Sequence, residues 1–306
     1  METIFHQGEL TVQAKAGEAG IANNVKRIIK NKIIKGAIPF LENQSFVIIS
    51  SLDANKKVWN SLLLGYSGWI DASTEGQLIF SLEKIISPKS DIFFQNIQAN
   101  EQVGLLFIEL GSRKRYRVNG RIKQNEEQLV LTIQEAYPNC PKYIQRRVLT
   151  PPNKETTPIP TRSKGTTLTP QQRTLIKSAD TFFVGSQSKA GFLDTSHRGG
   201  PIGFIDILVD GTFKIPDYKG NSLFNTLGNF MENPSAGLIF IDFEKGNTLQ
   251  ITGQATLLFD QFAEKDKLKT GDTGRYWLFQ PESWIQTNEH HKIIWEFLDS
   301  SPFNPQ

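Results

Sequence analysis

The strongest constraint on the fold of this chain is a repeat, because its second half follows its first at a nearly constant distance. The run VGLLFIEL at residues 103–110 matches AGLIFIDF at residues 236–243, an offset of 133 residues. Chance similarity between two β-rich halves would not keep such a register, so we predict an internal duplication. Further pairs support it: Phe46 with Phe182, Gly68 with Gly203, and Gly76 with Gly211, at offsets of 136, 135 and 135 residues.

Each half alternates short β-branched and aromatic runs with glycine turns, a pattern typical of antiparallel strands that close into a barrel. We therefore expect a mainly β (α+β) chain of two tandem barrels, packed as a pseudo-dimer with peripheral helices. The runs at 103–110 and 236–243 are too apolar to face water, so we place them in the barrel cores and at their mutual interface. Residues 18–34 predict one helix, residues 170–178 another, and residues 1–16 an irregular segment.

The domain boundaries follow from composition. Residues 1–150 form the first repeat with its N-terminal helix, and residues 170–306 form the second. The stretch between them, 151–169, is rich in threonine and proline and lacks periodicity, which is typical of a linker.

Composition excludes several functional classes. The 306 residues carry 34 basic and 31 acidic side chains, a net charge of +3, and the two signs are mixed along the chain, so we expect no nucleic-acid partner. The single cysteine, Cys140, excludes an internal disulfide, and the four histidines have no metal-ligand spacing, so we expect no metal. No run approaches the roughly 18 apolar residues of a membrane span, and no signal peptide is evident. We expect a soluble, cytoplasmic protein.

The most informative stretch for function is residues 196–229. A basic glycine turn, Ser196-His197-Arg198-Gly199-Gly200, precedes two strands, a polar loop with the sequence PDYKGN, and an amphipathic helix. Cations, glycines and a helix start this close together suit a phosphate-bearing cofactor. The alternative is a tight turn beside a surface arginine, followed by an ordinary loop in which Asn221 caps the helix.

Three motifs resemble those of the pyridoxamine 5'-phosphate oxidase-like family of flavin-binding split β-barrels. They are FHQGEL at residues 5–10, NCPKYIQRR at 139–147, and SHRGGP at 196–201 together with PDYKGNSLFNTLGN at 216–229. The resemblance implies six-stranded Greek-key barrels, FMN bound at the barrel–barrel interface, and a flavin redox role.

Carried over by motif, Arg198 and Lys219 would be the phosphate cations, with hydrogen bonds from Asn221 and Ser222. Asp217 and Tyr218 would lie near the flavin ring. The first repeat has only Ser87-Pro-Lys-Ser-Asp91 at the matching place, which puts a second, symmetric site in doubt. The first repeat could instead supply the other wall of the flavin site. The expected cofactor-binding residues are Ser196, His197, Arg198, Gly199, Gly200, Asp217, Tyr218, Lys219, Asn221 and Ser222, with Trp59, Asn60 and Ser61 from the first repeat.

The leading hypothesis is an FMN-dependent oxidoreductase of unknown substrate, with a small-molecule electron donor such as a nicotinamide nucleotide. No residue is named as a catalyst: His197 could be an acid–base group, although we favour a role in the pocket wall. The alternatives are a non-enzymatic flavin or haem carrier or sensor on the same barrel, and a deazaflavin-dependent reductase. Either a monomeric pseudo-dimer or a homodimer fits the duplication.

The roles of two basic clusters and of the cysteine stay open. The run Arg113, Lys114, Arg115 and Arg117 is typical of a solvated surface, or of a substrate anion site. Asn139 and Pro141 predict a helix start, so Lys142, Arg146 and Arg147 would form its solvated face or a second anion contact. Cys140 is either a small buried hydrophobe or a reactive thiol.

Overall fold

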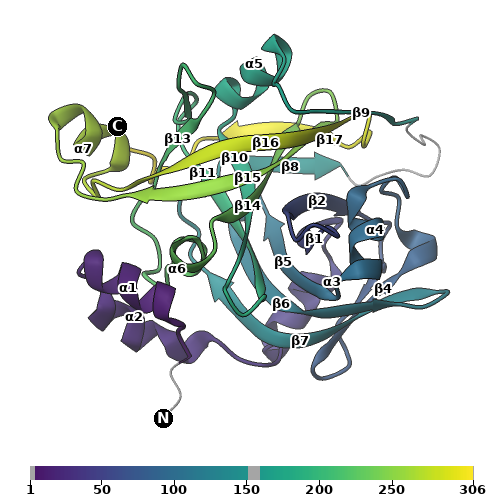
Figure 1. Cartoon of the computed structure of the whole chain (residues 1–306). Coiled ribbons are helices and arrows are strands. Elements are labelled where there is room, and N and C mark those ends of the chain that lie inside the picture. Colours follow the sequence, from purple (N-terminus) through teal and green to yellow (C-terminus); the bar gives the residue numbers. More distant parts are fainter. Residues whose placement is uncertain (1–3, 151–158, 306) are drawn as a thin grey trace.

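The structure, a computed structural model, describes residues 4–150 and 159–305. Two large antiparallel sheets dominate it, one in each half of the chain (Figure 1). The first sheet has the order β2-β1-β5-β6-β7-β4-β3, and the second has the equivalent order β11-β10-β14-β15-β16-β13-β12. The predicted fold, mainly β with two split-barrel repeats and peripheral helices, is confirmed. Each path has one strand more than the six expected, because a two-residue strand, β3 or β12, extends it.

The strands have the following bounds. In the first sheet they are β1 (Phe46–Leu52), β2 (Val58–Leu64), β3 (Ile70–Asp71), β4 (Gln77–Ser81), β5 (Gln102–Glu109), β6 (Lys114–Gln124) and β7 (Gln128–Asn139). In the second they are β10 (Thr181–Gln187), β11 (Leu193–Gly199), β12 (Asp206–Ile207), β13 (Phe213–Pro216), β14 (Ser235–Asp242), β15 (Asn247–Leu258) and β16 (Tyr276–Asn288). Beside the sheets lie the helices α1 (Gln7–Lys15), α2 (Ala19–Val25), α3 (Ile38–Glu42), α4 (Ile92–Ala99), α5 (Pro170–Ser178), α6 (Asn225–Glu232) and α7 (Glu264–Thr270).

The register of the duplication corrects the sequence alignment by one residue in the first strand of each half. Val47 packs in the core of the first barrel and Phe182 in the core of the second, whereas Phe46 lies between the barrels. Phe182 is therefore the equivalent of Val47, at an offset of 135. The same hydrogen bond in both halves supports this offset: Asn96 to Ser51 at 3.0 Å, and Asn229 to Ser186 at 2.9 Å.

As expected, the apolar side chains of β5 and β14 pack both inside their own barrel and between the two barrels. Leu105 packs inside the first barrel, while Leu106, one residue on, packs against Phe183 and Ile239 in a separate cluster between the barrels. Strand alternation explains this, because successive side chains point to opposite faces of a sheet and both faces here are covered. We call this contact between the two barrels the seam.

Two glycines bring the barrels together at equivalent points of the seam. A Cβ on Gly104 would lie 2.8 Å from the backbone of Asp194, and a Cβ on Gly237 would lie 2.6 Å from the carbonyl oxygen of Val58. Real side chains do not approach backbone so closely, so each crossing requires glycine. The seam is thus a close contact of β5 with β11 and of β14 with β2.

The N-terminal segment differs from its prediction. The helix expected over residues 18–34 ends as α2 at Val25 and continues only as one 3₁₀ turn, because the backbone of Lys30 pairs with Ala136 in an antiparallel bridge. Residues 1–16 were expected to be irregular, yet α1 forms there with a capping box between His6 and Glu9. Figure 1 shows α1 and α2 together beside α6.

The segment between the repeats is partly ordered into strands. Residues 161–165 of the expected linker form β9 (Thr161–Gly165), which pairs with β16. Residues 151–158 lie outside the described residues. Near the C-terminus, β17 (Ile294–Asp299) returns to the first half and pairs with β8 (Arg146–Thr150). Among the described residues, none of the helices combines the length and the apolar character needed to cross a membrane.

Candidate functional site

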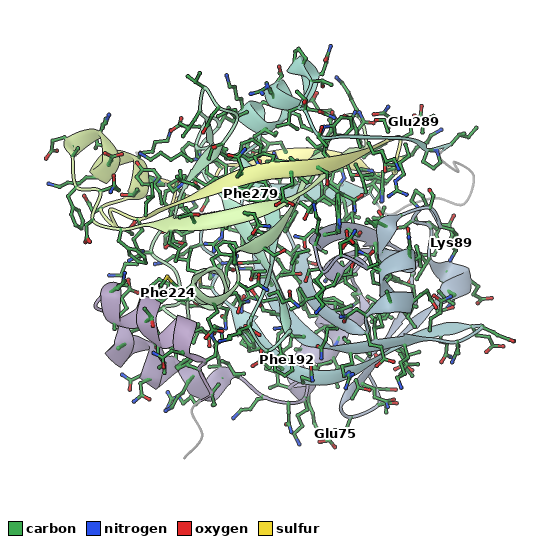
Figure 2. All side chains as sticks on the ribbon, viewed as in Figure 1. Glu75, Lys89, Phe192, Phe224, Phe279 and Glu289 are labelled. Atoms are coloured by element: carbon green, nitrogen blue, oxygen red, sulfur yellow. The ribbon has the colours of Figure 1, made fainter. Side chains whose placement is uncertain are left out.

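A hollow opens on the seam where β11 of the second sheet passes β6 and the end of β7 of the first. About 790 Å³ of space that protein atoms do not fill lies in the hollow and in front of it, open solvent included. Its walls are β6, the turn at residues 139–143, β11, and residues 216–227 after β13. Both barrels therefore build the hollow, and Phe224, labelled in Figure 2, lies on the wall beside the N-terminal helices.

Three guanidinium groups meet in this hollow. Arg198 comes from β11, and Arg115 and Arg117 come from β6 of the other barrel. On β6, Tyr116 and Val118 point into their own barrel core, so the alternating arginines point to the opposite face, towards the second barrel. The sequence left open whether this basic run is a solvated surface or an anion site; the structure brings two of its arginines into the hollow.

The three arginines are neutralised to different degrees. Arg117 forms a buried ion pair with Asp194 at 3.1 Å, and Arg198 pairs with Asp217 at 3.0 Å. No carboxylate of the described residues lies within ion-pair distance of Arg115, which donates from Nε to a backbone carbonyl at 2.7 Å. Burial without a counter-charge lowers the pKa of Arg115. The hollow therefore carries uncompensated positive charge.

Several buried polar atoms of this wall have no hydrogen-bond partner within the described protein. They are Nε of Arg117, Nε of Arg198, Nε2 of His197 and Nδ2 of Asn139. Leaving a buried donor unpaired costs free energy, so such groups normally have a partner. Guanidinium donors beside unpaired N–H groups fit a ligand that brings several anionic oxygens, such as a phosphate.

His197 is buried and neutral. Burial, followed by the charges of Arg115, Arg198 and Arg147, holds its pKa well below the ordinary value. Nη1 of Arg115 lies 3.4 Å from Nδ1 of His197, and because arginine can only donate, Nδ1 accepts and the proton of the ring is on Nε2. Nε2 is thus a neutral hydrogen-bond donor, and it has no partner among the described residues.

An aromatic pair forms another part of the wall. The rings of Tyr143 and Tyr218 lie 4.9 Å apart with a tilt of 39°, and the hydroxyl of Tyr143 donates to the carbonyl oxygen of Lys219 at 3.0 Å. Burial raises the pKa of Tyr143 to about 12, so its phenol stays protonated near neutral pH. Such a surface can stack on a planar ring system.

The hollow collects most of the residues that the sequence singled out in the second repeat: Ser196, His197, Arg198, Gly199, Asp217, Tyr218, Asn221 and Ser222. Two others lie beside it. The side chain of Lys219 is exposed, and Gly200 is buried behind the wall, where its N–H donates to the carbonyl oxygen of Asp180 at 3.1 Å. The binding roles assigned to these residues stay predictions.

Asp217 and Ser222 have partners within the protein rather than free polar groups. Asp217 accepts hydrogen bonds from Arg198 and from Arg275, each at 3.0 Å. The hydroxyl of Ser222 donates to Glu18 at 2.5 Å. Both side chains therefore fix the wall of the hollow.

Asn221 does not cap α6, contrary to one of the alternatives left open by the sequence. Oδ1 of Asn221 accepts the N–H of Leu223 at 3.2 Å, and α6 begins only at Asn225, after a left-handed Phe224. Two residues with positive φ, Ser222 at 63° and Phe224 at 61°, separate Asn221 from the helix, so it cannot cap the first turn.

The helix expected after Asn139 is also absent. Residues 140–145 form a turn with a left-handed Tyr143 at φ 66°, and β8 follows. This non-helical path places Ile144 in the seam and lets the Gln145 amide donate to the carbonyl oxygen of Gly200 at 3.2 Å.

The basic side chains of this segment therefore do not share a helix face. Lys142 and Cys140 line the hollow. Arg146 and Arg147 instead pair with Asp299 at 3.3 Å and Asp180 at 2.7 Å, and neither lines the hollow.

The pseudo-symmetric place on the seam lacks the equivalents of Arg117 and Arg198. Leu63 pairs with Val47 as Arg198 pairs with Phe182, so Leu63 stands where the second barrel has arginine. In the same way, Gln250 stands where β6 has Arg117. A backbone bridge between Gly65 and Ile85 closes this end of the first sheet.

The three residues expected from the first repeat lie in that second place. Trp59, Asn60 and Ser61 are buried on β2, away from the hollow. The indole of Trp59 donates to Asp53 at 3.0 Å, and Gln250 donates to the backbone carbonyl of Asn60 at 2.8 Å and to the hydroxyl of Ser61 at 2.9 Å. Within the described residues, no cluster of three or more histidine, cysteine or acidic side chains could hold a metal ion.

Comparison with known proteins connects the second half of the chain to a family. Residues 168–285 match the family model described as pyridoxamine 5'-phosphate oxidase. No curated protein matches the chain.

Among solved structures, a pyridoxamine 5'-phosphate oxidase-related, FMN-binding protein from Nostoc punctiforme is similar, at 10% identity and a TM-score of 0.30, over 44% of this chain and 100% of its own. HupZ from Group A Streptococcus is similar at 15% identity and a TM-score of 0.29, over 44% of this chain and 98% of its own. The haem storage protein HutZ from Vibrio cholerae is similar at 12% identity and a TM-score of 0.28, over 43% of this chain and 93% of its own. The second repeat therefore matches the pyridoxamine 5'-phosphate oxidase family over residues 168–285, and the sheet of the first repeat has the same strand order as the sheet of the second.

Proposed function

We propose that this chain binds FMN in the hollow on the seam and acts as a flavin-dependent oxidoreductase. The observation that carries the proposal is the meeting of Arg115, Arg117 and Arg198 from two barrels in one hollow with surplus positive charge. The family resemblance implies FMN, and the donors present suit its phosphate. Arg115, which lacks a counter-ion, and Arg198, whose Nε is unpaired, would hold that phosphate.

The remaining walls suit the rest of the cofactor. Tyr143 and Tyr218 offer an aromatic surface for a planar ring, and His197 offers a neutral donor at Nε2. FMN supplies two-electron hydride chemistry when it is bound, and the protein contributes binding, orientation and electrostatics. Asp217 would orient Arg198, since it accepts from Arg198 on one oxygen and from Arg275 on the other.

A non-enzymatic flavin carrier is a second candidate, and the state of His197 favours it. Acid–base catalysis near neutral pH needs a group that titrates there. The pKa of His197 is held well below its ordinary value, so the ring stays neutral and does not exchange a proton near pH 7. Reduction of the bound flavin by NADH or NADPH, followed by stopped-flow absorbance, separates the two candidates: a flavin that neither donor reduces supports the carrier.

The binding experiment is a titration of the purified protein with FMN, followed by flavin fluorescence. A hydrogen bond to a charged group contributes about 1.5–3 kcal/mol, so Arg115→Ala and Arg198→Ala should each weaken FMN binding roughly 10- to 100-fold. Arg121→Ala is the matched control, because Arg121 is an exposed arginine on the same strand, β6. Equal FMN affinity in all three variants would overturn the proposed phosphate site.

A further inference from the structure

The loop from residue 217 to 224, between β13 and α6, forms one wall of the hollow and has an unusual backbone. Ser222 and Phe224 both adopt left-handed φ values, 63° and 61°. Residues with a Cβ disfavour this conformation, and it persists only where surrounding structure fixes it. Neighbouring segments must therefore hold this loop in place.

Three buried side chains of the N-terminal helices hold it. Glu18, just before α2, accepts from the Ser222 hydroxyl at 2.5 Å. Nε2 of Gln13 donates to the carbonyl oxygen of Leu223 at 3.1 Å. In addition, Glu9 accepts from the Asn225 amide at 2.6 Å. The exposed fractions of Glu9, Gln13 and Glu18 are 4%, 2% and 8%, so their polar atoms depend on partners within the protein.

The helix pair is seated firmly enough to impose this geometry. Where α1 crosses α6, a Cβ on Gly8 would lie 2.1 Å from the carbonyl oxygen of Gly228, so the two helices touch through backbone. The N–H of Gly8 donates to Glu232 at 3.0 Å, and a ring nitrogen of His6 lies 3.0 Å from Oδ1 of Asn229. Figure 1 shows the same packing of α1 and α2 beside α6.

The same side chains connect to the arginines of the hollow. Glu18 also pairs with Arg275 at 3.3 Å; Arg275 pairs with Asp217, which in turn pairs with Arg198. On the other side, Arg117 donates to Asn225 at 3.1 Å, and the amide of Asn225 donates to Glu9. Two of the three arginines are thus linked to the N-terminal helices through one or two side chains.

We propose that Glu9, Gln13 and Glu18 are positioning residues for the cofactor loop, so the N-terminal helix pair is part of the cofactor site although it does not line the hollow. This inference rests on the proposed function for the identity of the ligand. The structural part of the inference, that the helix pair fixes residues 217–225, does not depend on which ligand is bound.

The test compares the double variant Gln13→Ala/Glu18→Ala with Gln7→Ala, a control whose side chain is exposed on the same helix α1. Amide hydrogen exchange of a peptide covering residues 217–226 is measured without added cofactor, and FMN affinity by fluorescence. Loss of two buried hydrogen bonds should speed exchange of the loop by about tenfold or more and weaken FMN at least tenfold. Gln7→Ala should change neither.

A conservative variant separates positioning from general stability. Glu18→Gln keeps an acceptor for Ser222 but removes the charge that pairs with Arg275. It should restore slow exchange of the loop while FMN affinity stays reduced. If the double variant does not fold, Gln13→Met decides instead, because it keeps the apolar part of the side chain and removes only the amide donor.

Loop exchange at the wild-type rate in a folded double variant, or in Gln13→Met, would overturn the inference. A wild-type protein that binds no FMN would overturn the proposed function instead, while the exchange experiment still decides the role of the helix pair.

Discussion

Replacing Glu9 by glutamine should change how the stability of this protein depends on pH. Glu9 is buried at the crossing of α1 and α6, where its carboxyl group accepts from the His6 N–H at 3.0 Å and from the Asn225 amide at 2.6 Å. Burial, with the nearby charges of Glu135 and Asp194, raises its pKa to about 8. The folded protein therefore keeps a proton on Glu9 at neutral pH, where the unfolded chain has lost it.

The sign and size of the effect follow from this difference. Between the ordinary pKa of 4.5 and the folded pKa of about 8, the folded state binds one proton more than the unfolded state, so stability falls as pH rises. At about 1.4 kcal/mol per pH unit, Glu9 lowers the free energy of unfolding by about 3 kcal/mol between pH 5 and pH 7.5. Glu9→Gln keeps the shape and the acceptor for Asn225 but removes this titration.

The assay is urea unfolding of wild type and Glu9→Gln at several pH values from 5 to 7.5, followed by tryptophan fluorescence. The free energy of unfolding of the variant, minus that of wild type, should rise by about 3 kcal/mol across this range. Glu126→Gln is the control for the removal of a carboxyl group as such, because Glu126 is exposed. A Glu9→Gln difference that stays constant with pH would refute the reasoning.

Three further substitutions test the packing. Gly228→Ala places a Cβ 2.5 Å from Cγ of Glu9, so it should push α1 away and lower the free energy of unfolding by about 1–3 kcal/mol in urea. Gly20→Ala lies within α2, where a Cβ meets nothing within 4 Å, so calorimetry should show a gain of up to about 1 kcal/mol. Leu106→Ala empties a fully buried position between the barrels and should cost about 2–5 kcal/mol of unfolding free energy, measured in urea; an unchanged value would contradict the seam.

The duplication and the fold could be predicted because glycine turns and the apolar runs of β5 and β14 repeat at fixed distances. The exact register of β1 and β10 could not. In FVIISS and FFVGSQ apolar residues occupy both faces, since one face lines a barrel and the other lines the seam, so a slip of one residue leaves the pattern intact. Packing, together with the matching hydrogen bonds of Asn96 and Asn229, identifies Val47 as the equivalent of Phe182.

The candidate site was only partly predictable for a related reason. Arg198 lies in a distinctive local motif, whereas Arg115 and Arg117 reach the hollow from the other barrel, 81 to 83 residues earlier in the sequence. A usable signal was present in the alternation of β6, where Tyr116 and Val118 claim one face and leave the arginines on the other. The start of α1 also has a signal in the sequence, because Glu9 follows His6 by the three positions of a capping box.

The proposed site holds one FMN on one side of the seam, by arginines of both barrels. The most direct measurement is the number of FMN molecules bound per chain at saturation, from isothermal titration or from the flavin released on denaturation. We expect one FMN per chain, because Leu63 and Gln250 stand in place of the arginines at the pseudo-symmetric place. Two per chain would contradict the asymmetry of the seam, and none would contradict the proposed cofactor.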